Sequence, residues 1–261
     1  MGEVWGKFRS LLRYTGIALL VVILAGCGLF KETADDGQSS WSNFSYFNHA
    51  ITDSLDDDSG LEALIFPYQR HVEGIRSRVL TRSEFRIEPG KPESALGNLI
   101  ADLIRSRASS ETGRSIDLAV FSSDELRIYL PEGEVTLGMI HDLIPSDEKL
   151  NLQKHTGKQI RKMADEIAAR GGDPISGLRM QISDDSATGV VIGSDQIEPN
   201  QTYWLVTYGR LADRESSLIN ALNAPIKSKK LDVTVREAVI DYLRARESIA
   251  PEKDHRIRLV R

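Results

Sequence analysis

An apolar pattern of helical period begins in residues 93–102, which read Glu93-Ser94-Ala95-Leu96-Gly97-Asn98-Leu99-Ile100-Ala101-Asp102. From this segment to Arg107, apolar side chains recur every three or four residues: Leu96, Leu99, Ile100, Leu103 and Ile104. That spacing places them on one face of an α-helix, and such a face is normally buried. The sequence therefore predicts an amphipathic helix from Glu93 to Arg107.

The segments after this helix alternate between strand and helix patterns. Apolar or alternating runs predict three strands, at residues 116–121, 178–182 and 203–207. A second helix is expected from about Lys158 to Ala169, ended by Gly171-Gly172. Thr234 with Glu237 makes a capping box for a last helix. Because helices and strands interleave, the predicted fold class is mixed α/β.

The amino terminus has the features of a secretory signal. Lys7, Arg9 and Arg13 precede the apolar run Ile17–Ala25, which is too short to span a bilayer comfortably. The run ends in Leu24-Ala25-Gly26-Cys27, which resembles the lipobox of bacterial lipoproteins. Residues 1–26 are therefore expected to be a removable signal, with Cys27 acylated by palmitate or a similar chain. The alternative is an uncleaved anchor with an incidental cysteine.

The net charge and the cysteine content restrict which partners and which cellular location are expected for this chain. Cys27 is the only cysteine, so the mature chain forms no intramolecular disulfide. Without residues 1–26 the chain has 30 basic and 37 acidic side chains, a formal charge of −7, which argues against nucleic acid as a partner. The residue after the cysteine is Gly28, not the aspartate that resembles an inner-membrane retention signal. We therefore expect a cell-envelope lipoprotein, with the outer membrane favoured.

The remaining chain divides into two parts. Residues 27–60 are rich in Ser, Asp, Asn and Gly and show no sustained apolar period, so they are interpreted as a flexible tether. Residues 61–261 are long enough for one domain with a substantial core.

Four segments of this domain resemble, in the same order, motifs of the carboxy-terminal domain of bacterial 5′-nucleotidases and related periplasmic UDP-sugar hydrolases. The match covers about Tyr68 to Ile257. Residues 93–102 resemble the family's E-S-x-L-G-N-L-I-A-D almost letter for letter. The other three segments are Pro131-Glu132-Gly133-Glu134-Val135-Thr136, Thr156-Gly157-Lys158-Gln159-Ile160 and Ser176-Gly177-Leu178-Arg179. The resemblance implies a single domain of that fold after the signal and the tether.

The resemblance implies that this domain recognises a substrate and does not hydrolyse it. In that family a preceding metallophosphoesterase domain holds two metal ions and carries out the hydrolysis. The D-x-H and G-N-H-[DE] motifs of that domain are absent from this chain. The five histidines are scattered singly, so no metal site and no cofactor are expected: His49, His71, His141, His155 and His255.

The residues that match the family's substrate site depart from its pattern. Residues 117–127 align without a gap with D-[IV]-A-[LF]-x-N-x-G-G-[IL]-R, and Arg127 matches the substrate-contacting arginine. Ser122 replaces the asparagine, whereas Asp124 and Glu125 replace two glycines that let a ligand approach the backbone. Two carboxylates at this position are expected to repel a phosphate, by roughly a few kcal/mol in a partly desolvated site.

The aromatic clamp of the family is also replaced. Its two base-stacking phenylalanines, in P-F-x-N and T-N-D-F-L-A, align with Ser146 and Arg210, and Glu148 stands for the asparagine of the first motif. The ribose-binding aspartate of G-G-D-G aligns with Ser216. Stacking contributes typically about 1–3 kcal/mol per base, which Ser146 cannot supply. Arg210 is expected to stack weakly or to pair with Asp124 or Glu125.

Two functions fit these residues. The first is a non-catalytic binding or interaction protein held to a membrane, whose ligand the sequence does not name. Its charged side chains suit a polar or zwitterionic ligand or pair with one another: Arg127, Arg179, Arg210 and Arg214 with Asp124, Glu125, Glu148 and Glu215. The second is the recognition subunit of a split 5′-nucleotidase-type hydrolase in nucleotide catabolism, with a separately encoded metallophosphoesterase as its partner. On either reading, activity of this chain alone is not expected.

The lipobox makes a direct prediction. We expect Cys27→Ser to leave an uncleaved precursor without an acyl chain, because the thiol is the acyl acceptor. Metabolic labelling of cells with a fatty-acid analogue measures this, and Gly28→Ala, which keeps the thiol, is the matched control. Equal labelling of the natural chain and of Cys27→Ser would exclude a lipoprotein.

Overall fold

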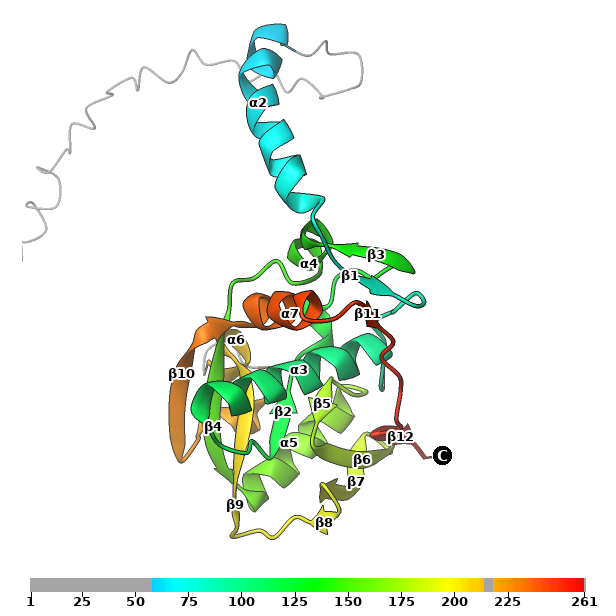
Figure 1. The fold of residues 1–261 in the computed structure, drawn as a ribbon. Helices are drawn as coiled ribbons and strands as arrows, with labels where there is room; N and C mark the ends of the chain where they lie inside the picture. Colours follow the sequence, from blue (N-terminus) through cyan, green and yellow to red (C-terminus); the bar gives the residue numbers. More distant parts are fainter. Residues whose placement is uncertain (1–57, 214–217, 261) are drawn as a thin grey trace, which may run out of the picture. The chain divides into compact units, whose positions relative to one another are not determined.

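The computed structural model describes residues 58–213 and 218–260, and its elements follow one another from α2 to β12 (Figure 1). The helices are α2 (Ser59–Arg76), α3 (Ala95–Thr112), α4 (Leu137–Leu143), α5 (Gly157–Ala169), α6 (Gly209–Ala212) and α7 (Val235–Arg244), with short 3-10 turns η1 (Ser123–Glu125) and η2 (Asn220–Asn223). The strands are β1 (Val79–Ser83), β2 (Leu118–Val120), β3 (Gly133–Thr136), β4 (Lys149–Thr156), β5 (Ile175–Ser176), β6 (Leu178–Ser183), β7 (Ser186–Ile192), β8 (Asp195–Gln196), β9 (Thr202–Tyr208), β10 (Lys227–Thr234), β11 (Ser248–Ile249) and β12 (Ile257–Leu259). The described part is therefore mixed α/β, as predicted.

A five-stranded sheet forms the centre of the domain, in the order β10-β4-β9-β2-β5. β2 runs parallel to β9, whereas β4 pairs antiparallel with both β9 and β10. All three residues of β2 are buried, as expected for a short apolar strand inside a sheet. Two smaller sheets, β11-β1-β3 and β12-β6-β7-β8, complete the fold.

The predicted amphipathic helix is α3, which packs against β2, β5 and β9. Its N-cap is Ser94, whose side chain accepts a hydrogen bond from the Gly97 amide, and Gly113 in the left-handed conformation ends it. The helix is thus about one turn longer at its end than the sequence pattern predicted. Position 97 requires glycine for a steric reason. A Cβ there would lie 2.9 Å from Cγ of Pro174, so a side chain would push α3 away from the segment before β5.

The segment at the start of α3 also holds the carboxy-terminal part of the chain. The Glu93 carboxylate accepts hydrogen bonds from the amides of Asp254 and His255, at 2.9 and 3.1 Å, and from the side chain of Asn98 at 2.7 Å. Residues 93–102 therefore stabilise the tertiary structure, since they connect α3 to a segment more than 150 residues later in the chain.

Arg256 makes the second connection between these segments. It is 9 % exposed, and its guanidinium binds both carboxylate oxygens of Asp102, at 2.8 and 3.0 Å. It also donates to the Ile175 carbonyl at 2.8 Å and to Asp254. A forked arginine–carboxylate pair fixes direction as well as distance, so Arg256 sets the position of β12 beside β6.

The other predicted elements are present. α5 and α7 begin with capping boxes at Thr156 and Thr234, and α5 is followed by Gly171-Gly172, both at positive φ. β6 alternates between buried and more exposed residues, and the apolar run 203–207 lies inside β9. Some element ends differ by one or two residues from the prediction, because the pattern marks the buried face and not the cap.

The long exposed helix α2 was not predicted. Its N-cap is Asp58, and it begins at Ser59, two residues before the expected start of the domain. Gly60, Pro67 and Gly74 lie inside it, and residues of these types weaken a sequence-based helix prediction. The expected signal, Cys27 and the rest of the tether lie outside the described residues. No helix in the described ranges is long and apolar enough to cross a membrane.

The buried arginine generates a stability prediction. We expect Arg256→Ala to lower the free energy of unfolding by about 2–3 kcal/mol, because it leaves Asp102 and the Ile175 carbonyl without their charged donor. Arg179→Ala, which removes an exposed partner of Asp254, should cost no more than about 1 kcal/mol. Urea unfolding of both variants measures this. Equal losses of unfolding free energy would show that the contacts of Arg256 stabilise the fold no more than the exposed Arg179–Asp254 pair does.

A buried histidine predicts a pH dependence. His155 in β4 is fully buried, and burial lowers its pKa from 6.5 to about 4. The folded state therefore binds fewer protons than the unfolded state between these values. The contribution of His155 to the free energy of unfolding should be fully present above pH 6.5. It should fall by up to about 3 kcal/mol as the pH falls to 4.

The measurement is the free energy of unfolding against pH for the natural chain and for His155→Gln. The variant should lose less stability between pH 6.5 and 4, whatever its stability at pH 7. His71→Gln, on the exposed surface of α2, should keep the pH profile of the natural chain. Parallel profiles for the natural chain and His155→Gln would show that this histidine is not the titrating group.

Candidate functional site

The aligned substrate-site residues come from three places in the fold. Ser122, Asp124 and Glu125 lie in and before the η1 turn that follows β2, and Arg210 lies in α6 after β9. Because β2 and β9 are parallel neighbours, the segments after them emerge at the same edge of the five-stranded sheet. The third place is the loop between α4 and β4, which contains Ser146 and Glu148.

A buried floor supports this edge. The rings of Phe121 and Tyr208, which lie at the ends of the two strands, are 4.7 Å apart and 1 % and 2 % exposed. Ser122 is also buried, and its hydroxyl accepts a hydrogen bond from the Asp124 amide. Burial, and then the negative charge of Glu125, raises the pKa of Tyr208 far above its usual value. Tyr208 therefore stays protonated and cannot act as a general base.

Arg210 pairs with Glu125. Its guanidinium lies 3.2 Å from the Glu125 carboxylate, whose side chain is only 8 % exposed, whereas the Arg210 side chain is 55 % exposed. A carboxylate this deeply placed needs a cation to offset its loss of hydration. One of the two outcomes expected for Arg210, pairing with a neighbouring carboxylate, is thus the one observed.

Asp124 has a different partner, Arg170, which follows α5. The guanidinium binds Asp124 at 2.7 Å and the fully buried carboxylate of Asp173 at 2.8 Å. The other oxygen of Asp173 accepts hydrogen bonds from the amide and the hydroxyl of Ser123, at 3.0 and 2.9 Å. Arg170 and Asp173 therefore hold the η1 turn in place, a role that the sequence did not reveal because these residues lie far from the turn in the chain.

The remaining aligned residues differ in their surroundings. The carboxylate of Glu148 packs against Gly209, next to Arg210, at a distance that leaves no room for a Cβ there. Ser146 is half-buried, whereas Arg127 is exposed and forms no ion pair within 4 Å in the described ranges. Ser216 and Cys27 lie outside the described residues.

Arg179 does not belong to this group. It binds Asp254 at 2.9 Å and lines another part of the surface. The structure thus brings Ser122, Asp124, Glu125, Glu148 and Arg210 to one edge of the sheet and separates Arg179 from them. In the described part of the group, each of Asp124, Glu125 and Arg210 has an oppositely charged partner within the chain.

These ion pairs alter the charge that a phosphate would meet at this edge of the sheet. The sequence suggested that Asp124 and Glu125 repel a phosphate; in the structure Arg210 pairs with Glu125, and Arg170 is shared between Asp124 and Asp173, so the repulsion is reduced. In both pairs the arginine already binds a carboxylate, so it is less available to bind a phosphate. Four carboxylates at this edge, Asp124, Glu125, Asp173 and Glu148, thus face three arginines, so some repulsion of a phosphate remains, and Arg127 is the arginine here with no ion pair in the described ranges.

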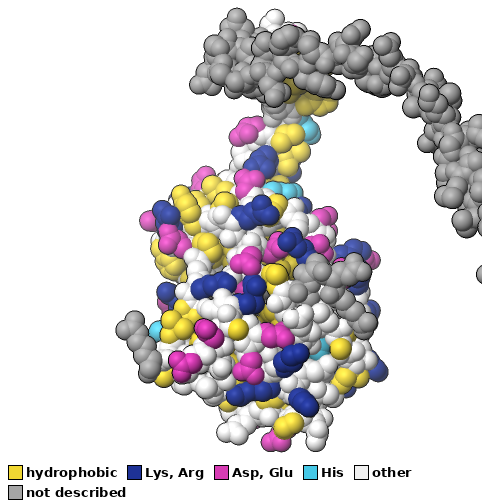
Figure 2. Space-filling view, turned by 180° about the vertical axis from the view of Figure 1, so that it is seen from behind, with side chains coloured by type: hydrophobic (Ala, Val, Ile, Leu, Met, Phe, Trp, Pro, Cys, Tyr) yellow, Lys and Arg dark blue, Asp and Glu magenta, His cyan; other side chains and the backbone are white. Residues whose placement is uncertain are grey.

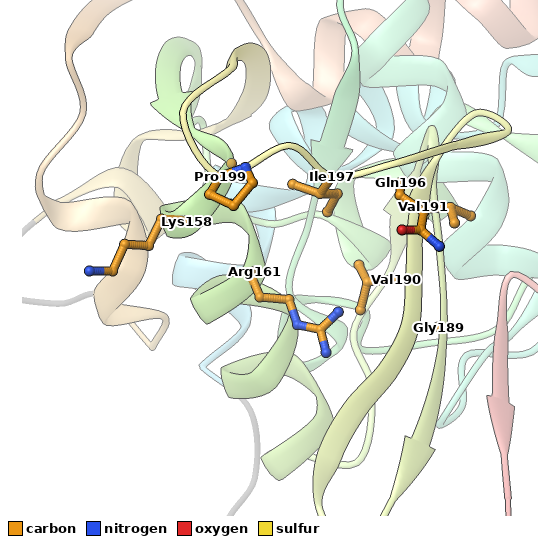
Figure 3. Close-up of a pocket in the computed structure, with 9 residues that line it drawn as sticks. Lys158, Arg161, Gly189, Val190, Val191, Gln196, Ile197 and Pro199 are labelled. Atoms are coloured by element: carbon orange, nitrogen blue, oxygen red, sulfur yellow. The ribbon is translucent and has the colours of Figure 1, made fainter.

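Three hollows of the surface lie elsewhere. One, of about 390 Å³, lies between the start of α5 and β7; its lining includes Lys158, Ile197, Val190 and Arg161, and the Arg161 side chain extends toward Val190 (Figure 3). The amides of Gly157 and Lys158 already donate to protein carbonyls, so this helix end is no anion site. The other two, of about 790 and 310 Å³, share Arg105, Gly177 and Gly193. None of the three is lined by the residues that align with the nucleotide site.

The described ranges contain no group of three or more His, Cys, Asp or Glu residues arranged to hold a metal ion. His155 is buried in β4 with Nε2 2.8 Å from Gln153 Oε1, and its Nδ1 has no hydrogen-bond partner within the described part of the chain. Its surroundings are those of a core residue, since Gln153 is its polar neighbour and β4 is buried along most of its length.

Comparison with known proteins identifies the fold. The profile of the family "5′-nucleotidase, C-terminal domain" matches residues 76–222, which is more than half of the chain. The 5′-nucleotidase precursor of Thermus thermophilus superposes with a TM-score of 0.68 at 18 % identity, over 79 % of this chain and 44 % of that chain. The NAD nucleotidase of Haemophilus influenzae gives a TM-score of 0.58 at 16 % identity, over 80 % and 43 %.

A curated relative in Bacillus subtilis (strain 168), Endonuclease YhcR, is 25 % identical over 219 residues. The match covers 78 % of this chain and 17 % of that protein. The chain thus spans less than half the length of each of these proteins. By the family profile and the shared fold, it belongs to the family of proteins with a 5′-nucleotidase C-terminal domain.

Proposed function

We propose that this chain is a membrane-anchored lipoprotein whose 5′-nucleotidase C-terminal domain binds a ligand or a protein partner without catalysing hydrolysis. The anchor is Cys27, acylated after removal of residues 1–26, and the domain faces the periplasm or the cell surface, on the outer membrane where the cell has one. The lipobox sequence supports the anchor, and the ion-paired residues at the edge of the sheet support a ligand or partner other than an ordinary nucleotide.

The observation that carries the proposal is the Arg210–Glu125 pair. In the family, the aligned position of Arg210 supplies an aromatic ring that stacks on the nucleobase, and the aligned position of Glu125 is a glycine beside the ligand. Here the two side chains bind each other at 3.2 Å, and Arg170 binds Asp124 in the same way. Groups that satisfy one another inside the chain are poor groups for binding a nucleotide, because a ligand must first break their pairing.

The split hydrolase is the second candidate. It is favoured by the comparison with the solved nucleotidases, of which this chain matches 44 % and 43 %. On that reading a separate metallophosphoesterase supplies the chemistry. Deleting the gene of this chain would then lower AMP hydrolysis by intact cells, whereas the first proposal expects that hydrolysis to stay unchanged.

Nucleotide binding separates the proposed role from that of an ordinary 5′-nucleotidase domain. We expect adenosine and AMP both to bind the natural chain weakly, because the stacking clamp is absent, and AMP to bind no better than adenosine, because Arg170 and Arg210 already bind carboxylates. Isothermal titration calorimetry measures both affinities. Micromolar binding of AMP, or metal-dependent phosphate release that copurifies with the chain, would contradict the proposal.

Restoring the clamp tests the reason for weak binding. Ser146→Phe with Arg210→Phe returns two rings but leaves Glu125 without its cation, so Glu125→Gly should accompany them. This triple variant should gain adenosine affinity by at least about tenfold, since two stacking contacts contribute about 1–3 kcal/mol each. The matched control without rings is Ser146→Ala with Arg210→Ala and Glu125→Gly. Equal adenosine affinity in both triple variants would show that these positions do not face a base.

A further inference from the structure

The helix α2 carries a concentration of exposed apolar side chains. None of its 18 residues is buried. Six large hydrophobic side chains of this helix are at least 39 % exposed: Leu61, Leu64, Ile65, Phe66, Tyr68 and Val72. Figure 2 shows hydrophobic side chains along this helix where it stands away from the rest of the domain. Contiguous exposed apolar surface of this kind marks an interaction site.

Four of the exposed side chains form one line along the helix. Leu61, Ile65, Tyr68 and Val72 are spaced by four, three and four residues, which is the repeat of the contact positions of a coiled coil. In that repeat Ile65 and Val72 occupy the a positions, and Leu61 and Tyr68 the d positions. We call these four residues the α2 seam.

The residues that disfavour a helix lie away from the seam. Gly60, Pro67 and Gly74 recur at intervals of seven, all at the outward c position of the same repeat. Phe66 also lies outside the seam, at a b position, where the Arg70 guanidinium stands 5.8 Å from the centre of its ring. The helix thus keeps its regular apolar contacts for one face.

The domain itself determines which way a second helix can lie. The residue that would continue the seam, Ile75, is half-buried against the core, and Arg76 next to it binds Asp142 of α4 at 2.6 Å. The seam therefore runs into its own domain just beyond Val72. Two parallel helices would bring both domains into the same space at that end, whereas two antiparallel helices place the domains at opposite ends.

We propose that the α2 seam pairs with the α2 seam of a second copy of this chain in an antiparallel, two-fold symmetric helix pair. In register, Leu61 then lies level with Val72 of the second copy, and Ile65 lies level with Tyr68, so each a position meets a d position. Exchanging the two copies reproduces the same contacts, as two-fold symmetry requires.

The residues that flank the seam are compatible with this register. In an antiparallel pair each e position lies beside an e position of the other helix, and each g position beside a g position. Glu62 therefore lies near Gln69 of the second copy, and Leu64 lies near His71. These neighbours bring no like charges together, and Leu64 adds apolar contact at the border of the seam.

The size of the seam sets the strength of this pairing. Four side chains per copy bury roughly 800 Å² in total, which is below the about 1,200 Å² of a standard stable interface. The dimer is therefore weak in dilute solution. Confinement to one membrane, as in the proposed function, raises the local concentration and favours the dimer, although the contacts themselves do not need the anchor.

Cysteine cross-linking of the full chain tests both the pairing and its direction, because Cys27 is the only natural cysteine. Chains with Leu61→Cys and chains with Val72→Cys should form a disulfide-linked dimer when the two are mixed. Neither should do so alone, because the same residue in two antiparallel copies is separated by roughly 16 Å along the axis. The natural chain controls for reaction at Cys27, and Arg70→Cys, on the outward face, controls for random collision.

The outcomes are distinct. A cross-link that appears in the mixture and in neither single variant supports the proposal. Equal cross-linking by each variant alone would mean a parallel pair, and a mixture no better than Arg70→Cys would mean that a different molecule covers the seam; either result overturns the proposal. Fatty-acid labelling of the same samples reports the anchor separately, so failure of the anchor and failure of the dimer are not confused.

A second measurement does not depend on cysteines. Tyr68→Glu should weaken dimerisation by at least about tenfold in analytical ultracentrifugation, because it places charge in the middle of the seam, whereas Arg70→Glu should not. Urea unfolding should be nearly unchanged in both variants, since the two side chains are exposed. A Tyr68→Glu chain that dimerises as the natural chain does would also overturn the proposal.

Discussion

The forked contact between Arg256 and Asp102 connects parts of the chain that lie far apart in the sequence. It joins α3, the central helix, to the last strand, and through the Ile175 carbonyl it also reaches β5 at the end of the five-stranded sheet. Glu93 adds hydrogen bonds to the same carboxy-terminal segment. A buried guanidinium needs partners for its donors, so the positions of α3, β5 and β12 are specified together and not one element at a time.

The same requirement shapes the altered site, with the charges reversed. A buried carboxylate at Glu125 and a fully buried one at Asp173 each bind an arginine, and those arginines come from α6 and from the end of α5. The resemblance implies that position 125 lies beside a ligand in the family, whereas here Glu125 binds Arg210. The fold of the family is retained, and the charged groups on the loops at this edge of the sheet bind one another. This is the physical basis for proposing a role in binding or interaction and not in recognition of nucleotides.

The exposed helix α2 shows the complementary situation, an element with apolar contacts left unsatisfied by its own domain. Most of the domain buries its apolar side chains in one continuous core, but the α2 seam points to solvent. The spacing of its four apolar residues is the same in both directions along the helix, and the packing of the end of α2 against its own domain favours the antiparallel direction. Association of two chains would thus follow from a feature that adds little to the folding of either one.

Sequence patterns were enough to indicate six of the helices and strands and the family of this protein. Period and capping residues revealed α3, α5, α7, β2, β6 and β9, and the motif in residues 93–102 indicated the fold, because these signals depend on neighbours within one turn or one strand. The sequence also suggested candidate site residues and, as one of two alternatives, that Arg210 pairs with Asp124 or Glu125, but it gave no sign of Arg170 or Asp173. The folded arrangement shows that Arg170 binds Asp124, that Arg210 takes Glu125 as its partner and that Arg179 lies elsewhere. These pairings join residues from separate elements, and their geometry exists only once the sheet has placed those elements at one edge.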